Sequence, residues 1–476
     1  MCTDKVMASG QTGADDEAWE LARKLVQIDS SDPGAYEGNI ERYIKGWLET
    51  RIAALPAELA ARIRIDELEA LPGRTELMAT IPSRFESIAT GGNAKEATQD
   101  QDWSQYVSKR MLTCRTASGN AAATAQDQTQ NASRCASAYS VAPKASLPRL
   151  VYICHMDTVT LGNGWDADID PLSGLIRDER LYGRGSCDMK SGLASAMAAF
   201  ARMLERVAAS GQLPERAFSL ICTVDEEDFM RGVEAAISAG WVGNEEWVLD
   251  TEPTDAQIQV AHKGRTWFEL TMEGVTAHAS QPWKGADAIA AIAETIGGIR
   301  RAIEAQPTHP ELGHSTVTFG QIEGGYRPYV VPDQAKVWID MRLAPPCDTA
   351  AATRIVKKAI ERAEEAVPGT HGSYVITGDR PAIERDPASP LLAGLLAATG
   401  RVLGTPAEVG IFTGYTDTAV IAGTTGNHNC MSYGPGSLAL AHKPNEYVPH
   451  ADVRRAQAVL TELATRCLWN GEGTKA

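Results

Sequence analysis

The sequence predicts an α/β fold in which a mixed sheet is covered by helices on both faces and a smaller α+β unit interrupts the chain. After residue 148, short apolar runs of strand length alternate with helical patterns. From about residue 262 the order changes to strand, helix, strand, strand, helix, which suits a small two-layer sandwich. We therefore expect a larger domain formed by 1–261 and 373–476, interrupted by a second domain at 262–372.

The first part of the chain contains helices and then a polar segment. Residues 15–54 fit two helices separated by the turn-forming sequence DSSDPG at 29–34, and a less regular stretch follows to about residue 85. Residues 91–143 hold few aliphatic side chains other than alanine, so they can bury little apolar surface. We expect 91–143 to be a flexible surface insertion, with a small helical excursion at 103–112 as the alternative.

The remaining elements follow from hydrophobic periodicity. The larger domain should contain strands at 150–154, 218–224 and 247–250, and helices at 192–209, 390–403 and 451–468. The smaller domain should contain strands at 266–272, 315–322 and 335–342, and helices at 286–305 and 349–367.

Composition and charge exclude several classes of protein. The 476 residues include 45 Lys and Arg against 61 Asp and Glu, a net charge of −16 that argues against nucleic acid or an anionic membrane as a partner. No apolar run is long enough to cross a bilayer, and the N-terminal sequence lacks the apolar segment of a secretory signal. The nine cysteines form no CxxC pair, so we expect reduced, mostly buried thiols and a cytoplasmic location.

Five segments carry side chains that suit metal binding. Three of them lie at the ends of predicted strands: HMD after 150–154, DEED after 218–224, and DTE, whose Asp250 is the last residue of 247–250. The fourth is Asp188, in a glycine-rich loop, and the fifth contains His442, late in the chain. Histidines with several carboxylates are typical ligands of a dinuclear zinc site. Each segment also has an ordinary structural role available: Asp188, for example, could cap the helix that begins near Ser191. Five such segments in one chain favour the metal site.

Local geometry suggests which of these side chains bind metal, which orient a ligand and which act as a base. Residues i and i+2 of an extended segment point the same way, so Asp157 can accept the second ring N–H of His155 and fix its tautomer. The neighbours Glu226 and Glu227 point in different directions. One of them can therefore bind metal while the other acts as a base.

Taken together, these motifs resemble one family. VYICHMDTV, LYGRGSCDMKSG, the DEE of TVDEED, the TEPT of VLDTEPT and GPGSLALAHKPNEYV are similar, in this order, to the dinuclear zinc peptidases and deacylases. That family includes aminoacylase, carboxypeptidase G, acetylornithine deacetylase and succinyl-diaminopimelate desuccinylase. The resemblance covers most of the chain outside 91–143.

The resemblance implies two zinc ions per subunit, with cobalt or manganese as possible substitutes, and a role for each motif residue. Asp188 would bridge the metals and the peptide bond after it is often cis. Asp250 competes with Glu252 for one position. The implied metal ligands are His155, Asp188, Glu227, Glu252 and His442, with Glu226 as general base and Asp157 as the residue that orients His155.

The resemblance also implies a function for the inserted domain, as a lid that usually mediates homodimers. His278 would polarise the scissile carbonyl, often across the dimer, and Gly414 belongs to a loop beside the substrate pocket. Arg342 would meet a substrate carboxylate or, alternatively, pair with a nearby acid. Tyr329 stands where many members carry a lid asparagine, so the substrate contacts there should differ.

The expected activity is hydrolysis of the amide bond of a small N-acyl amino acid by metal-activated water. Glu226 would take the proton of the attacking water and pass it to the leaving amine. A dipeptidase or carboxypeptidase acting on small peptides with a free carboxylate is the alternative. A metal-stabilised binding protein without catalysis is a more remote one, which the presence of every ligand position disfavours.

Overall fold

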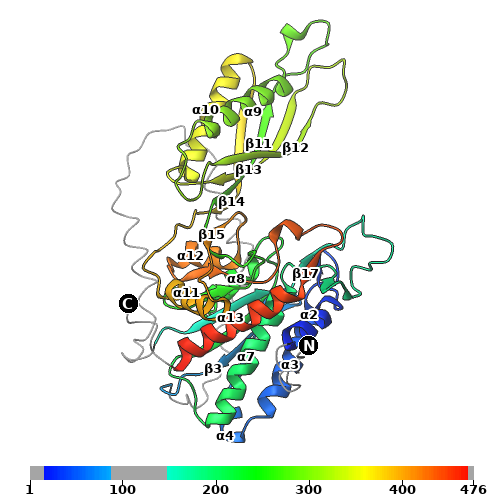
Figure 1. Ribbon diagram of the computed structural model, residues 1–476. Helices are drawn as coiled ribbons and strands as arrows, with labels where there is room; N and C mark the ends of the chain where they lie inside the picture. The colour runs from blue at the N-terminus through cyan, green and yellow to red at the C-terminus, as the bar shows by residue number, and fades with distance from the viewer. Residues whose placement is uncertain (1–15, 87–146, 470–476) are drawn as a thin grey trace, which may run out of the picture.

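The computed structural model describes residues 16–86 and 147–469. Figure 1 shows a larger unit, built on an eight-stranded sheet, and a smaller unit at the top, built on a four-stranded sheet. The predicted insertion at 91–143 lies outside the described residues. No helix within the described ranges is long and apolar enough to span a membrane.

The sheet of the larger unit is mixed, as predicted. Its strands lie in the order β15-β10-β16-β9-β4-β8-β3-β2, with β9, β4 and β8 parallel to one another and antiparallel pairs toward both edges. The strands are β2 (Arg64–Leu71), β3 (Arg74–Ile81), β4 (Leu150–His155), β8 (Phe218–Thr223), β9 (Trp247–Asp250), β10 (Ile258–His262), β15 (Val409–Phe412) and β16 (Cys430–Ser432).

Helices cover both faces of this sheet. Alternate residues of β4 enter different cores: Tyr152 and Cys154 pack in one apolar cluster, and Val151 and Ile153 in the other. The first cluster contains α2 (Glu17–Val26), α3 (Gly38–Ala53), α7 (Lys190–Ser210), α11 (Pro390–Leu403) and α13 (His450–Trp469). The second contains α8 (Arg231–Ser238) and α12 (Asp417–Thr425).

Residues 64–81 are more regular than predicted, since they form the hairpin of β2 and β3 at one edge of the sheet. The connecting Gly73 has φ +73°, a conformation that glycine adopts without strain. The edge strand β2, RIDELEAL, is exposed or half-buried along its length. It therefore lacks the apolar run by which the interior strands were identified.

Shorter elements connect the layers. They are β1 (Ser31–Asp32), β5 (Thr158–Val159), β6 (Leu175–Arg177), β7 (Arg180–Tyr182), β17 (Tyr447–Pro449), α4 (Ala57–Ala60) and the 3₁₀ turns η1 (Pro282–Lys284) and η2 (Leu438–Leu440).

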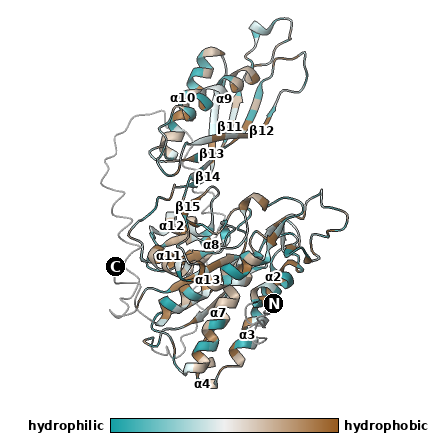
Figure 2. Ribbon diagram, viewed as in Figure 1, coloured by the Kyte–Doolittle hydropathy of each residue, from teal (hydrophilic) through white to brown (hydrophobic). Residues whose placement is uncertain are grey.

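The smaller unit is an antiparallel sheet with two helices. Its strands lie in the order β12 (Thr316–Gly324), β13 (Gln334–Leu343), β11 (Gly264–Glu273) and β14 (His371–Arg380). Alternate residues of β13 are buried and join α9 (Ala288–Glu304) and α10 (Thr349–Ala366) in a separate core. Hydrophobic and hydrophilic residues alternate along α10, as expected for a helix with one buried face (Figure 2).

The fourth strand of this sheet was not predicted, and the expected domain boundary at residue 372 falls inside it. The sequence of β14, HGSYVITGDR, contains few apolar residues, and most of its side chains are exposed or half-buried. Its place is fixed by pairing with β11 along its whole length. Tertiary pairing, rather than a local apolar pattern, makes this segment a strand.

Two chain segments join the units, and they lie side by side. The backbone N–H of His262 donates to the carbonyl oxygen of Ile383 at 2.9 Å, and the reciprocal bond has the same length. Gly264 packs so closely there that a Cβ atom would lie 2.9 Å from the carbonyl oxygen of Arg380. The entry to and exit from the smaller unit are thus held together by backbone contacts.

The cysteines within the described residues agree with the predicted chemistry. All six have free thiols and are buried, at Cys154, Cys187, Cys222, Cys347, Cys430 and Cys467. They contribute to the packing of the cores and form no disulfide in the described part of the chain.

Candidate metal site

The predicted ligands meet at the carboxyl ends of the central parallel strands. His155 is the last residue of β4, Glu226 and Glu227 follow β8, and Glu252 follows β9. Parallel strands place such loops at one edge of a sheet, where α/β proteins commonly carry their sites. Asp188 enters the same region from the loop that precedes α7, and the peptide bond after it is cis.

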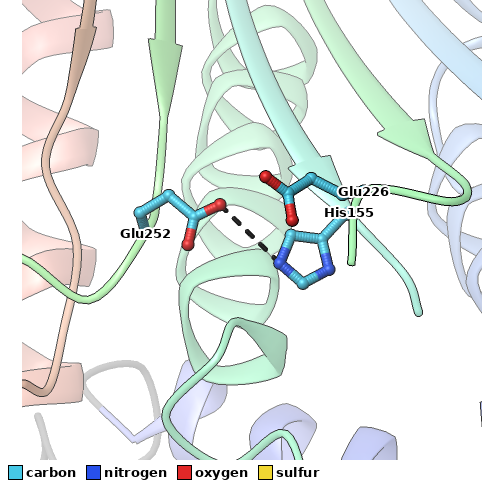
Figure 3. Close-up of side chains that lie close together, drawn as sticks. All are labelled: His155, Glu226 and Glu252. Atoms are coloured by element: carbon cyan, nitrogen blue, oxygen red, sulfur yellow. Dashed lines mark ion pairs between the residues drawn. The ribbon is translucent and has the colours of Figure 1, made fainter. Parts of the chain in front are cut away.

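The first group of side chains surrounds His155, which is buried. Its Nε2 lies 3.2 Å from Oδ1 of Asp188 and 3.6 Å from Oε1 of Glu252. Figure 3 shows the Glu252 and Glu226 carboxylates converging on this imidazole from separate loops. Ligand-capable atoms of His155, Glu226 and Glu252 all lie within 4.8 Å of one another, close enough to share one metal ion.

A second group surrounds His442 and shares Asp188 with the first. Nε2 of His442 lies 3.4 Å from Oδ2 of Asp188 and 2.8 Å from Oε2 of Glu227. Asp188 therefore directs one oxygen to each histidine. A carboxylate in this position can bridge two metal ions.

Asp157 lies beneath both groups and fixes the loop after β8. Its Oδ1 accepts the backbone N–H of Glu226 at 3.3 Å, and its Oδ2 accepts that of Glu227 at 3.0 Å. Nδ1 of His155 is 3.6 Å from Oδ1 of Asp157 and 3.0 Å from its backbone oxygen. Although burial opposes ionisation, the interaction with His155 lowers the pKa of Asp157. The residue thus positions both the imidazole and the two glutamates.

The donor set fits divalent cations, by three observations on this structure. Burial, and then the charge of Asp188, raise the pKa values of Glu227 and Glu252. Oε1 of Glu227 is buried without a hydrogen-bond partner. Asp188 and Glu227 raise the pKa of His442 to about 10, so the surrounding carboxylates favour a positive charge at this position. Imidazole with carboxylates is a donor set suited to zinc.

Glu226 is the glutamate predicted to act as the general base, and burial raises its pKa as it does those of Glu227 and Glu252. The side chain is buried, and this burial places the pKa of its carboxyl group well above the usual range. A carboxylate with a raised pKa suits proton transfer near neutral pH. Its side chain therefore has the chemistry expected of a base.

Asp250 is held by a hydrogen bond to one of its carboxylate oxygens. Its Oδ2 accepts the hydroxyl of Thr418 at 2.8 Å, and burial raises its pKa to about 6. Glu252 is the residue that approaches His155. Of the two acids that the sequence left in competition, the geometry favours Glu252 as a ligand.

A third group of acids, close to the first two, is paired with an arginine. Arg74 pairs with Asp32 at 2.7 Å and with Asp225 at 3.1 Å, and forms a two-pronged contact with Glu37. Although Asp32 and Glu37 lie close to Asp157, both are already in contact with the Arg74 guanidinium. These buried pairs anchor the start of the loop that carries Glu226.

The sequence analysis missed Glu446, which supports Asp188 from behind. Its Oε1 accepts the backbone N–H groups of Cys187 at 2.8 Å and Asp188 at 3.1 Å, and its Oε2 pairs with Arg184 at 2.6 Å. The position of Glu446 shortly after His442, in AHKPNEYV, was the available signal. Nothing local showed that its carboxylate points toward the Asp188 loop.

The predicted substrate contacts lie outside the metal-ligand groups. His278 and Tyr329 are exposed on the smaller unit, and Nδ1 of His278 contacts the Ser280 hydroxyl at 2.8 Å. Arg342 forms two hydrogen bonds with Asp340, at 2.9 and 3.0 Å, and thus pairs with a nearby acid, the alternative to a substrate contact. Gly414 lies in the loop before α12, where Asp417 accepts the hydroxyl of Thr223 at 2.7 Å.

Comparison with known proteins agrees with this arrangement. Residues 151–466 match the family described as peptidase family M20/M25/M40. A probable carboxypeptidase of Aspergillus oryzae is 28% identical over 346 residues, which are 70% of this chain and 76% of that one. A probable succinyl-diaminopimelate desuccinylase of Staphylococcus aureus is 26% identical over 328 residues, covering 63% and 79%.

Solved structures show the same fold. A tripeptidase from Staphylococcus aureus superposes with a TM-score of 0.65 at 18% identity, covering 94% of this chain and 97% of that one. A dinuclear metal-binding peptidase of the M20 family from Bacillus subtilis gives 0.60 at 13% identity, covering 96% and 99%.

Proposed function

Since the chain belongs to the peptidase family M20/M25/M40, and is thus a metallohydrolase acting on amide or peptide bonds, we propose that it is a zinc-dependent deacylase of small N-acyl amino acids. The observation that carries the proposal is the placement of Asp188 between His155 and His442, with Glu226 beside them. The non-catalytic alternative is not favoured, because every expected ligand position and the base are present.

His155, Asp188 and Glu252 would hold one zinc ion, and Asp188, Glu227 and His442 the second. Cobalt and manganese are possible substitutes, since the same donors bind them. Bound there, the ions would supply Lewis-acid polarisation of a carbonyl and a lower pKa for water.

Glu226 would move the proton during the reaction. Its buried carboxylate accepts a proton from the attacking water and later delivers it to the leaving amine, so that the amine departs neutral. Asp157 keeps Glu226 and Glu227 in place through their backbone N–H groups. Exclusion of bulk water from these buried carboxylates strengthens every charge interaction in the site.

A second candidate is a carboxypeptidase or dipeptidase acting on small peptides. The relative named carboxypeptidase supports this reading, and the relative named desuccinylase supports deacylation. Both reactions break an amide bond next to a free carboxylate. They differ in the acyl group rather than in the chemistry of the metal site.

The test combines metal analysis with a substrate panel. We expect about two zinc ions per chain, the content of a dinuclear site, and turnover of N-acetyl or N-succinyl amino acids. Turnover of dipeptides alone would instead assign the second candidate. A protein that binds no metal on reconstitution and hydrolyses none of the panel contradicts the proposal.

We also propose a homodimer formed through the smaller unit, in the cytoplasm. Large aromatic side chains are exposed on two neighbouring segments of that unit, with Trp283 75% exposed in one and Tyr326 63% and Tyr329 59% exposed in the other. Association would cover them and bring His278 toward the partner's site. The buried free thiols suit a reducing compartment. Light scattering should give twice the chain mass, and Trp283→Asp should give a monomer.

A further inference from the structure

Three arginines lie side by side across the base of the smaller sheet. In the register of the strands, Arg265 of β11 is opposite Arg342 of β13 on one side and Arg380 of β14 on the other. The outer two have acidic partners: Arg342 contacts Asp340, and Arg380 pairs with Glu234 at 2.6 Å.

The central arginine has no such partner. Arg265 is only 8% exposed, its Nε is buried without a hydrogen bond, and it forms no ion pair with any residue in the described ranges. Its guanidinium lies 4.2 Å from the ring centre of Trp267 and 5.9 Å from that of Tyr415. A buried charge without a counter-ion is costly, so this position calls for an anion.

The place of Arg265 relates it to the metal site. Tyr415 lies in the loop between β15 and α12. Asp417, the first residue of α12, accepts a hydrogen bond from Thr223 at the end of β8, the strand before Glu226. Burial lowers the pKa of Arg265, and the charges of Arg342 and Arg380 lower it further, while Glu226 and Asp340 oppose them. The negative charge of Glu226, the proposed base, thus acts on this guanidinium.

We propose that Arg265 binds the carboxylate of the substrate. A guanidinium can donate two parallel hydrogen bonds to a carboxylate, and the aromatic rings of Trp267 and Tyr415 orient its plane for this contact. Arg342, the residue expected from the sequence to do so, is already paired with Asp340. The assignment rests on the proposed function, since it names the group that a hydrolase at this site recognises.

The first arm of the test compares each substrate with its carboxamide. Arg265→Met should lower kcat/KM for a hydrolysed N-acyl amino acid by about 10- to 100-fold, the effect of losing a charge-assisted hydrogen bond. The same variant should change kcat/KM for the corresponding α-carboxamide by less than about threefold. Arg206→Met is the matched control, because Arg206 lies 4.1 Å from the Trp469 ring centre, away from the metal site.

Equal losses on the acid and the amide would overturn the assignment. The assignment would also be overturned if Arg342→Met lost the preference for the acid over its carboxamide while Arg265→Met kept it. If Arg265→Met does not fold, as judged by its thermal midpoint, Arg265→Gln makes the same comparison with a polar neutral side chain.

The second arm does not depend on turnover. Succinate binding, measured by calorimetry on the metal-loaded protein, should weaken in Arg265→Met and remain in Arg206→Met. Succinate binding through Arg265 without hydrolysis of any substrate contradicts the proposed function and supports this inference. Hydrolysis with succinate binding that is unchanged in Arg265→Met supports the function and overturns the inference.

Discussion

The carboxylate of Glu446 accepts the backbone N–H of Asp188 at 3.1 Å, so the residue that bridges the two histidines is held from behind by a buried acid. The same carboxylate pairs with Arg184. Burial raises the pKa of Glu446 to about 7. The pair therefore connects the stability of the fold with the position of the proposed bridging ligand.

Replacement of Glu446 by alanine should lower both the stability of the fold and the affinity for metal. Arg184 would remain buried without its partner, at a cost of about 3–5 kcal/mol in the free energy of unfolding. Metal affinity should fall about 10- to 100-fold, as for residues that orient ligands. Urea unfolding and zinc titration measure the two effects. The double variant Arg184→Met/Glu446→Ala should recover part of the stability; if it is less stable than the single variant, the pairing argument is wrong.

Glu226→Gln should separate binding from catalysis. The amide keeps the size of the side chain but cannot take a proton, so we expect turnover to fall by about 10²- to 10⁴-fold. Zinc content should stay close to that of the unmodified protein. Asp228→Asn in the same loop is the control, because Asp228 is paired at 3.5 Å with Arg231 rather than with a proposed metal ligand. Retention of most activity in Glu226→Gln would rule out this base.

Gly192→Ala should destabilise the chain at the start of α7. A Cβ at this position would lie 2.0 Å from the carbonyl oxygen of Thr251, in the segment that leads to Glu252. We expect a loss of about 1–3 kcal/mol or more in the free energy of unfolding, as for overpacked cores.

Gly46→Ala in α3 is the matched control for this prediction, because a Cβ added at Gly46 would meet no atom of the described residues within 4 Å beyond its chain neighbours and the backbone of its own helix. It should instead stabilise the protein by about 0.5–1 kcal/mol. Urea unfolding of both variants would test the contrast, and equal effects would contradict it.

His262 should make the protein sensitive to acid. Burial lowers its pKa from 6.5 to about 4, and its Nδ1 has no hydrogen-bond partner. Between these values the unfolded chain binds a proton that the folded chain does not, so stability is complete above pH 6.5 and is lost as pH falls through 4. The contribution is at most about 3 kcal/mol. His262→Gln should show a smaller drop in urea midpoint from pH 7.5 to pH 4.5; an unchanged drop would contradict this.

The elements with a strong local pattern could be predicted from the sequence. Predicted and observed bounds agree for the strand at 247–250 and the helix at 390–403. The interior strand β3 was missed although it is largely buried. The strands β2 and β14 were missed because both are edge strands with many exposed polar residues. Such strands are specified by the neighbour with which they pair.

The candidate site likewise contains residues that could be predicted from the sequence and residues that could not. Ligand types and their order along the chain pointed to His155, Asp188 and His442. The supports of these residues could not be read from the sequence, because they come from distant segments: Glu446 acts on Asp188, and Arg74 on the loop before Glu226. Arg265 was missed because an arginine in a strand looks ordinary until its neighbours are known.

The backbone bonds between His262 and Ile383 have a consequence for how such a chain can change over evolution. Because the two ends of the smaller unit are adjacent, a short turn could close the larger sheet in its place. That unit can thus be gained, exchanged or lost as a cassette without disturbing the strands that carry the metal ligands. Substrate preference could then diversify by recombination while the hydrolytic chemistry stays the same.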